Sequence, residues 1–219
     1  MIQKPAEKKY LVQKNLYASS GYIVDDVDIK GKVLGAPTER TSYGNEDYIY
    51  IRTANPVKKG DKFYTIRTPR KIKHPETGKT LGYLIEITGV TEVVGKESGE
   101  IKAKVPVFYA EIDEGSPLID YYEMEPPLFI ENPRTPEING FIVASKESVT
   151  SIIVYIDKGT KDGIEVGDLL GMTARAKFNV PNGYLQIIKT QEKTATAIIR
   201  KYTKEVSVGD FIGPLAGSS

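Results

Sequence analysis

The sequence predicts an all-β protein made of two tandem small β-barrels. Three observations predict this fold: apolar residues alternate with polar ones or form short β-branched runs, turn residues bound these runs, and several blocks occur twice in the same order. Short strands separated by glycine, proline, asparagine and aspartate are typical of small barrels. Helical periodicity is poor, so helical turns are expected only over Glu7–Leu16 and near Ser145–Val149.

The strands are expected where apolar and β-branched residues run together for about five to seven positions. The clearest runs are Tyr48–Ile51, Leu84–Ile87, Ile152–Ile156 and Ala195–Ile199. Each is followed by residues that favour turns, as a strand of a small barrel requires. The chain of 219 residues is long enough for two such domains, each with its own core.

An internal duplication is the most informative feature of the sequence. Five blocks recur in the same order: Gly31–Ala36 with Gly140–Ser145, Tyr48–Ile51 with Ile153–Ile156, Val57–Phe63 with Ile164–Leu170, Gly82–Ile87 with Gly183–Ile188, and Ile112–Leu118 with Val206–Ile212. Blocks that recur in register indicate a repeated unit. The first copy is longer, and its extra residues are expected in two hairpin tips, Lys71–Lys79 and Val94–Gly99, where insertions cost little.

The duplication predicts four segments. Residues 1–19 form a charged lead-in, 20–119 the first barrel repeat, 120–137 a proline-rich acidic linker and 138–219 the second barrel repeat. Four prolines between Ile119 and Glu137 stiffen the chain and stop strands from continuing. We expect an ordered strap that packs Tyr121 and Tyr122 on a barrel and buries Leu128 or Phe129; a loose tether is the alternative.

Composition argues against an enzyme. The chain has no cysteine and one histidine, which excludes disulfides, thiolate metal sites, cysteine nucleophiles and multi-histidine metal sites. No phosphate-binding glycine loop or serine nucleophile elbow is present, so no cofactor is expected. A formal net charge of +1 gives no field that would attract nucleic acid. No apolar run is long enough for a membrane helix.

Three Gly-Asp pairs are candidate structural turns. The pairs are Gly60 with Asp61, Gly167 with Asp168 and Gly209 with Asp210. Glycine tolerates positive φ, and aspartate bonds back to nearby amides, so a tight turn before a strand is the interpretation. The alternative, in which the three aspartates bind a metal, lacks the dense oxygen ligands of a calcium loop.

A basic loop is a candidate docking surface for an acidic partner or phosphate. Its members are Arg67, Arg70, Lys71, Lys73 and His74. A solvated hairpin tip is the alternative interpretation, and His74 is expected to be exposed there rather than catalytic.

Tyrosine is abundant, with 14 residues, and offers a second binding hypothesis. Tyr10, Tyr17, Tyr22 and Tyr43 would form a stacking platform for sugars or bases. Together with the basic loop, this platform would make the chain a glycan- or polyanion-binding module of the cell envelope.

Turn and strand patterns over nearly the whole chain from about residue 20 resemble a bacterial protein region. The patterns are Ser20–Val24, Gly31–Leu34, Asp47–Ile51, Lys59–Phe63, His74–Gly78, Leu81–Tyr83 and Val154–Asp168. They resemble the segment that follows the LysM module in exported LysM proteins, among them the type IV pilus secretin-associated protein. The region is also similar to the C-terminal domain of the flagellar assembly protein FlgT.

The resemblance implies a periplasmic, non-catalytic accessory or scaffold protein at the outer-membrane secretin of type IV pili. It implies the secretin or pilus machinery as partner, and peptidoglycan as a second partner through a LysM module. No LysM module precedes the repeats, so we expect a shortened protein or a relative without this anchor. Exposed strand edges of small barrels suit subunit docking and would also allow a homo-oligomer.

Overall fold

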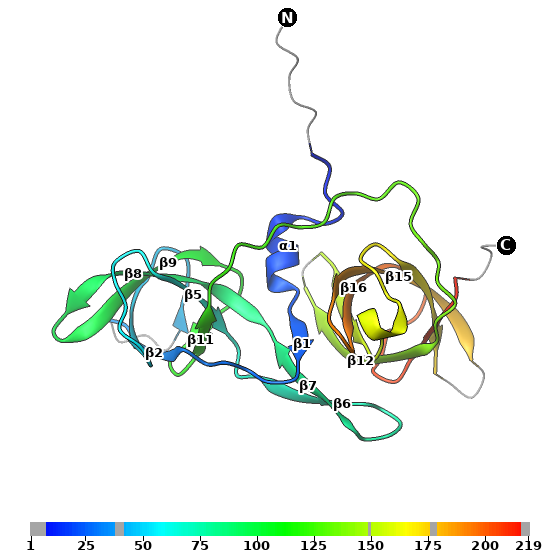
Figure 1. Ribbon diagram of the computed structural model, residues 1–219, viewed down its shortest axis with the longest axis horizontal. Helices are drawn as coiled ribbons and strands as arrows, with labels where there is room; N and C mark the ends of the chain where they lie inside the picture. Colours follow the sequence, from blue (N-terminus) through cyan, green and yellow to red (C-terminus); the bar gives the residue numbers. More distant parts are fainter. Residues whose placement is uncertain (1–7, 38–41, 149, 176–178, 216–219) are drawn as a thin grey trace, which may run out of the picture. The chain divides into compact units, whose positions relative to one another are not determined.

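The computed structural model describes residues 8–37, 42–148, 150–175 and 179–215 (Figure 1). Strands dominate the described chain, and its helical elements are the short helix α1 (Lys14–Ser19) and the 3-10 turn η1 (Thr160–Asp162). Two of the sheets are closed six-stranded antiparallel barrels, which confirms the predicted fold class of two small β-barrels.

The first barrel closes in the order β11-β2-β4-β9-β8-β5. Its strands are β2 (Gly31–Gly35), β4 (Tyr48–Thr53), β5 (Lys62–Ile66), β8 (Ile87–Glu97), β9 (Glu100–Phe108) and β11 (Pro117–Asp120). Alternate residues of these strands point inward and form the core, including Val33, Ile49, Ile51, Ala103 and Leu118. A two-stranded sheet of β3 (Ser42–Tyr43) and β10 (Ile112–Asp113) adds Tyr43 and Ile112 to this core.

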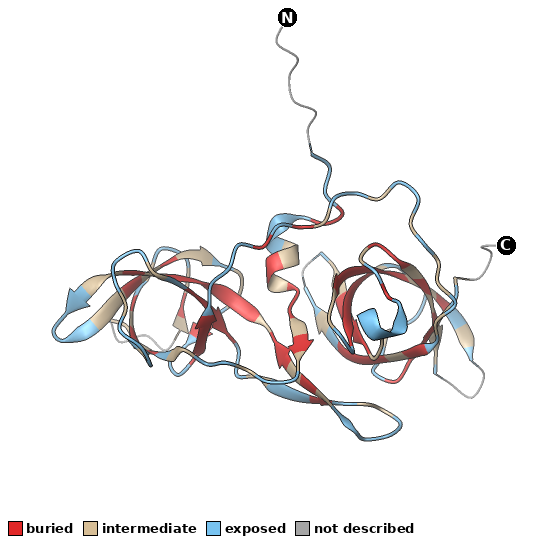
Figure 2. Cartoon of the chain, in the orientation of Figure 1, coloured by how far each residue is buried: buried red, intermediate tan, exposed pale blue. Residues whose placement is uncertain are grey.

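The second barrel closes in the order β12-β13-β16-β15-β14-β17. Its strands are β12 (Gly140–Glu147), β13 (Ile152–Ile156), β14 (Leu169–Ala174), β15 (Val180–Thr190), β16 (Ala195–Tyr202) and β17 (Phe211–Gly213). Ile142, Val154, Leu170, Leu185 and Ile187 are among its fully buried core residues. Figure 2 shows the buried segments of each barrel along its strands.

Both barrels have the same topology. When the six strands of each are numbered in chain order, both close as 1-2-5-4-3-6. The register of strands 1 and 2 also shifts at the same place, after Val33 in β2 and after Ile142 in β12. Equal strand order with an equal irregularity supports the internal duplication that the sequence predicts.

One block of the predicted duplication is out of register. Lys62, at the start of β5, lies opposite Glu92, and the corresponding Leu169 of β14 lies opposite Gln186. Gly183 therefore corresponds to Gly89, not to Gly82 as predicted. The Gly82–Ile87 block misled because it has the same glycine-then-apolar pattern, but Gly82 belongs to β7 (Thr80–Ile85).

Strand β7 lies outside the closed barrels. It pairs in the order β1-β7-β6 with β1 (Tyr22–Val24) and β6 (Arg70–Lys73). The β6–β7 hairpin contains Lys71–Lys79, so this hairpin is extra length of the first copy, as predicted. The other predicted insertion, Val94–Gly99, is wrong. Val93 and Ile101 of the first barrel correspond to Ile187 and Ala195 of the second. The number of residues between them is the same in both barrels, so this hairpin tip adds no length to the first copy.

The helical expectations were only partly met. Helix α1 begins at Lys14, and Glu7 lies outside the described residues. Ser145–Glu147 is strand, not helix, because these residues continue the ladder of β12 with β13. Val149 also lies outside the described residues.

The chain forms two compact units. The first-barrel unit contains Ala18–Lys71 and Gly82–Met124. The second-barrel unit contains the N-terminal segment up to Tyr17, Ile72–Leu81 and the chain from Glu125 onward. The tip of the β6–β7 hairpin and most of the predicted linker therefore belong with the second barrel by their contacts.

Backbone hydrogen bonds and the Arg134 side chain hold the strap over residues 125–137, whereas Leu128 and Phe129 do not serve as buried anchors. Leu128 is 55% exposed and Phe129 48% exposed, so the prediction that one of them is buried is wrong. Tyr10 and Leu128 form an antiparallel bridge, in which the Leu11 amide donates to Pro127 O and the Phe129 amide donates to Lys9 O, both at 2.8 Å. These two hydrogen bonds fix the strap around Leu128 without burying its side chain.

Candidate binding site

The three predicted Gly-Asp pairs form one recurring turn. In each, the glycine has a φ near 95° (93°, 96° and 95° at Gly60, Gly167 and Gly209). Each aspartate accepts a hydrogen bond through Oδ2 from the amide three residues earlier, at 2.8–2.9 Å. The turns at 60 and 167 precede strand 3 of their barrels, and the turn at 209 precedes strand 6. Among the described residues, no group of three or more acidic or histidine side chains is placed to hold a metal ion.

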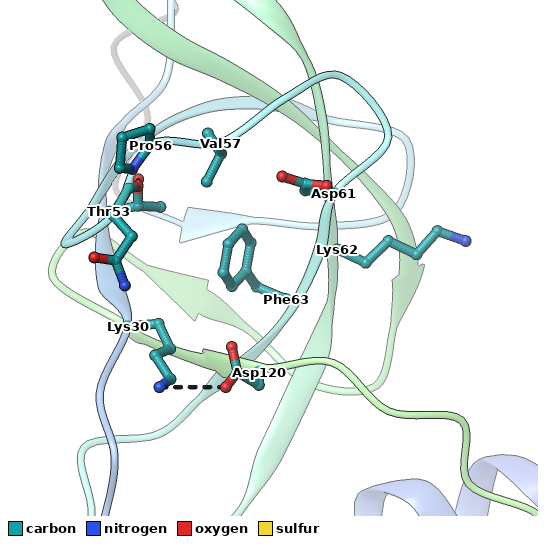
Figure 3. A pocket seen from close by; sticks show the side chains of 9 residues that line it. Lys30, Thr53, Pro56, Val57, Asp61, Lys62, Phe63 and Asp120 are labelled. Carbon is teal, nitrogen blue, oxygen red and sulfur yellow. Dashed lines mark hydrogen bonds and ion pairs between the residues drawn. The ribbon is translucent and has the colours of Figure 1, made fainter.

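A pocket of about 390 Å³ lies beside the first of these turns, at one end of the first barrel (Figure 3). Its lining residues come from the ends of β4, β5 and β11 and from the loops before β2 and between β4 and β5: Lys30, Thr53, Asn55, Pro56, Val57, Asp61, Lys62, Phe63 and Asp120. Phe63 supplies an apolar surface, and charged groups of both signs surround it. The pocket therefore combines apolar and charged contacts, as sites for polypeptides do.

The charges of this pocket are partly paired with each other. Lys30 Nζ lies 3.3 Å from Asp120 Oδ2 and 2.5 Å from Asp28 Oδ2. Hydrogen bonds with these two carboxylates raise the pKa of Lys30. Asp61 uses Oδ2 for the Lys58 amide, and among the described residues its Oδ1 has no hydrogen-bond or ion-pair partner.

In the second barrel, the strap occupies the place next to the corresponding turn. Arg134 Nε lies 3.2 Å from Asp168 Oδ1, its Nη1 pairs with Glu165, and its Nη2 donates to Gly163 O at 3.0 Å. The Leu169 amide donates to Arg134 O at 2.8 Å. Asp168 is only 1% exposed, and this burial raises its pKa, while Arg134 and the Glu165 amide act in the opposite direction.

The two places correspond residue by residue. The shared turn and strand register align Gly163, Glu165, Asp168 and Leu169 of the second barrel with Pro56, Lys58, Asp61 and Lys62 of the first. These four positions in the second barrel are the ones that Arg134 contacts. Of the four in the first barrel, all but Lys58 line the pocket.

The predicted basic docking surface follows strand β6 and its lead-in. Arg67, Arg70 and Lys71 belong to the first-barrel unit, and Lys73 to the second-barrel unit. All four side chains are exposed, whereas Ile72 between them is buried. In the three-stranded sheet β6 is an edge strand, where exposed cations also protect against edge-to-edge pairing.

His74 does not have the solvated environment that the sequence predicted. Its side chain is 16% exposed, and its Nε2 lies 3.1 Å from Asp157 Oδ2 within the second-barrel unit. Nδ1 accepts hydrogen bonds from the amides of Glu76 and Thr77 at 3.2 and 3.3 Å, and the ring packs edge-on against Phe141. The loop prediction failed because the sequence carries no signal for the distant Asp157 partner.

The predicted tyrosine platform is not a single surface. Tyr43 is 3% exposed and belongs to the core of the first barrel. Tyr17 lies over the ammonium group of Lys189, and Tyr22 accepts a hydrogen bond from the hydroxyl of Tyr122. Tyr10 bonds Glu125 in the strap. These tyrosines thus serve separate local contacts.

Sequence reasoning missed a buried lysine on the second barrel. Lys189, near the end of β15, is 7% exposed, and its Nζ lies 4.5 Å from the centre of the Tyr17 ring. Burial, and secondarily the charge of Lys146, lower the pKa of Lys189 to about 7. The signal was weak, because a single lysine at a strand end normally faces solvent.

Comparison with models of known protein families and with curated proteins finds no match for this chain. In the described part of the chain, no helix is both long and apolar enough to cross a membrane.

Proposed function

We propose that this chain is a non-catalytic accessory or scaffold module that binds other proteins. One observation carries the proposal: the first barrel has a pocket at the position where the second barrel binds an extended segment through Asp168 and the Leu169 amide. A pocket with Phe63 between charged side chains has the mixed character of a protein-binding surface.

The non-catalytic part of the proposal is supported by the way the chain uses its reactive groups. Both ring nitrogens of His74 are engaged by Asp157 and by backbone amides. The aspartates of the Gly-Asp turns hold backbone amides in place. These contacts support a structural role for His74 and for the Oδ2 atoms of the three aspartates.

The proposed setting follows from the resemblance to the region after the LysM module. We propose that the module acts in the periplasm, in association with the outer-membrane secretin of type IV pili, and that a LysM module would tether it to peptidoglycan.

The binding test uses the full chain immobilised on a biosensor and purified secretin complexes in solution. Saturable binding that survives the His74→Ala change is expected; no association at any concentration would overturn the assignment to the secretin.

The exposed cations of β6 and of the segment before it favour one alternative function, binding of a glycan or polyanion. Arg67, Arg70, Lys71 and Lys73 present their side chains to solvent. If this surface binds polyanions, the chain should be retained on heparin or peptidoglycan sacculi at low salt and released as salt screens the charges. A variant with all four changed to glutamine is the matched control. Retention of the variant would show that this surface is not the binding site, and recovery of both proteins in the supernatant would exclude the function.

A further inference from the structure

We propose that the pocket of the first barrel binds an extended segment of a partner protein that carries an arginine, with the guanidinium on Asp61. The inference rests on the proposed protein-binding function and names the chemistry of the partner. The chain itself supplies the precedent, because its own strap binds the second barrel in this way.

The strap binds the second barrel through the side chain of Arg134 and through one backbone hydrogen bond. Arg134 reaches the buried Asp168 with its guanidinium and also bonds the carbonyl of Gly163. Its own carbonyl accepts a hydrogen bond from the amide of Leu169, the first residue of strand β14. Backbone hydrogen bonds give affinity for an extended segment, and an arginine on a carboxylate adds a strong charge-assisted contact that selects the residue.

The first barrel offers the corresponding groups. Asp61 is held by the same turn as Asp168, with Oδ2 on the amide of Lys58 and Oδ1 directed to no partner among the described residues. In the second barrel the equivalent Oδ1 is the atom that Arg134 contacts. Pro56 takes the place of Gly163 and still has a carbonyl, and Phe63 adds an aromatic ring on which a guanidinium can stack.

One difference in residue type between the two barrels changes the charge of the site. Glu165, which pairs with Arg134, is replaced by Lys58 in the first barrel. The partner's arginine therefore has one carboxylate from the turn instead of two, and a neighbouring acidic residue in the partner would pair with Lys58. The strap has this composition as well, since Glu131 and Glu137 flank Arg134. The partner segment is therefore expected to combine an arginine with nearby carboxylates.

The test uses a synthetic peptide with the sequence of residues 128–137, LFIENPRTPE, which matches this chemistry. The labelled peptide is titrated into the full chain and binding is followed by fluorescence anisotropy. A peptide with alanine in place of arginine, and the Asp61→Asn protein, should each bind at least about tenfold more weakly. Asparagine can still accept the Lys58 amide, so the turn is retained. Glu100→Gln, which removes an exposed carboxylate of the same barrel, should bind like the wild type.

A second variant is expected to bind the peptide more tightly than the wild type. Lys58→Glu recreates the carboxylate pair of the second barrel and should tighten binding by about fivefold. Equal affinity of wild type, Asp61→Asn and Lys58→Glu proteins, or no binding of the peptide to any of them, would overturn the arginine proposal. The proposed function is judged separately, because a chain that binds secretin complexes but not this peptide keeps the function and loses only the arginine chemistry.

Discussion

A single glycine in each barrel allows strand 4 to pass very close to strand 5. At Gly183 a Cβ atom would lie 2.0 Å from Lys201 O and 2.6 Å from the Lys201 carbonyl carbon, and the backbone has a φ of 121°. At the corresponding Gly89 a Cβ would lie 2.7 Å from Val107 O. Backbone atoms cannot give way as the end of a flexible side chain can, so both positions require glycine.

Replacing Gly183 by alanine should therefore destabilise the chain by more than about 3 kcal/mol, because both the contact and the positive φ are unfavourable. The control is Gly60→Ala, where φ is 93° but a Cβ meets nothing within 4 Å. That change should cost only about 1–2 kcal/mol. The free energies of unfolding in urea measure both. Equal losses would show that backbone conformation, and not the close approach, sets the requirement.

The second prediction at the residue scale concerns Lys189, whose pKa is lowered to about 7 by burial and then by Lys146. An unfolded lysine titrates near 10.4, so between about pH 7 and pH 10 the unfolded state binds more protons than the native state. Stability should therefore rise with pH across this window. Lys189→Met should stabilise the chain at pH 7 by a few kcal/mol and flatten this rise.

Urea unfolding at pH 7 and pH 9.5 measures this effect. Lys201→Met, at an exposed position of β16, is the matched control and should leave the pH dependence as in the wild type. A Lys189→Met chain that is less stable than the wild type at pH 7 would contradict the prediction and would show that the ammonium contact with Tyr17 outweighs the cost of burial.

At the scale of elements, the strap shows how an irregular segment is fixed. It contains no named strand, yet its backbone pairs with residues 9–11 at one end and with Leu169 at the other. Arg134 connects the second contact to the buried Asp168. The sequence predicted an ordered strap from its prolines. Of the predicted anchors, Tyr121 and Tyr122 pack against Tyr64 of the first barrel, but Leu128 and Phe129 are exposed. Hydrogen bonds between distant backbone groups leave no pattern in a sequence.

Arg134→Ala should destabilise the second barrel by about 1–3 kcal/mol, since it leaves the carboxylate of Asp168 buried without its cation. In an Asp168→Asn background the same change should cost clearly less, because no buried charge is left behind. Urea unfolding of the four proteins gives the coupling energy of the pair. A coupling energy near zero would show that the ion pair contributes little and that the strap is held by its backbone alone.

Strand patterns were also easier to predict than the pairing between strands. The runs Tyr48–Ile51 and Ile152–Ile156 are strands at corresponding places in the two barrels, because β-branched alternation marks them locally. The register of strand 4 was placed seven residues too early, on Gly82 instead of Gly89. The strand register and the turn contacts resolve this choice: the Gly60 amide bonds Val93 O as the Gly167 amide bonds Ile187 O.

At the scale of the whole molecule, each barrel contains a smaller repeat of its own. The order 1-2-5-4-3-6 is unchanged when strands 1, 2 and 3 are exchanged with 4, 5 and 6. The turn before strand 6 also has the geometry of the turn before strand 3: the Gly209 amide bonds Ile142 O, and in the first barrel the Gly115 amide bonds Val33 O. The sequence did not reveal this half-barrel repeat because little more than the glycine turn is shared.

The duplication predicts that the second barrel is complete without the first. All six of its strands and its buried core lie between Gly140 and Gly213. A fragment of residues 125–219 should therefore give the circular dichroism of a β-protein and unfold cooperatively in urea.

The control fragment, 125–206, lacks β17 (Phe211–Gly213), which pairs with both β12 and β14 and closes the barrel. Without β17 the barrel is open, so it exposes the edges of β12 and β14 and the core residues near Ile142. The control fragment should therefore be unfolded or aggregate. If 125–219 were also unfolded, the barrel would need the N-terminal segment up to Tyr17 and the tip of the β6–β7 hairpin, and would not be an independent repeat.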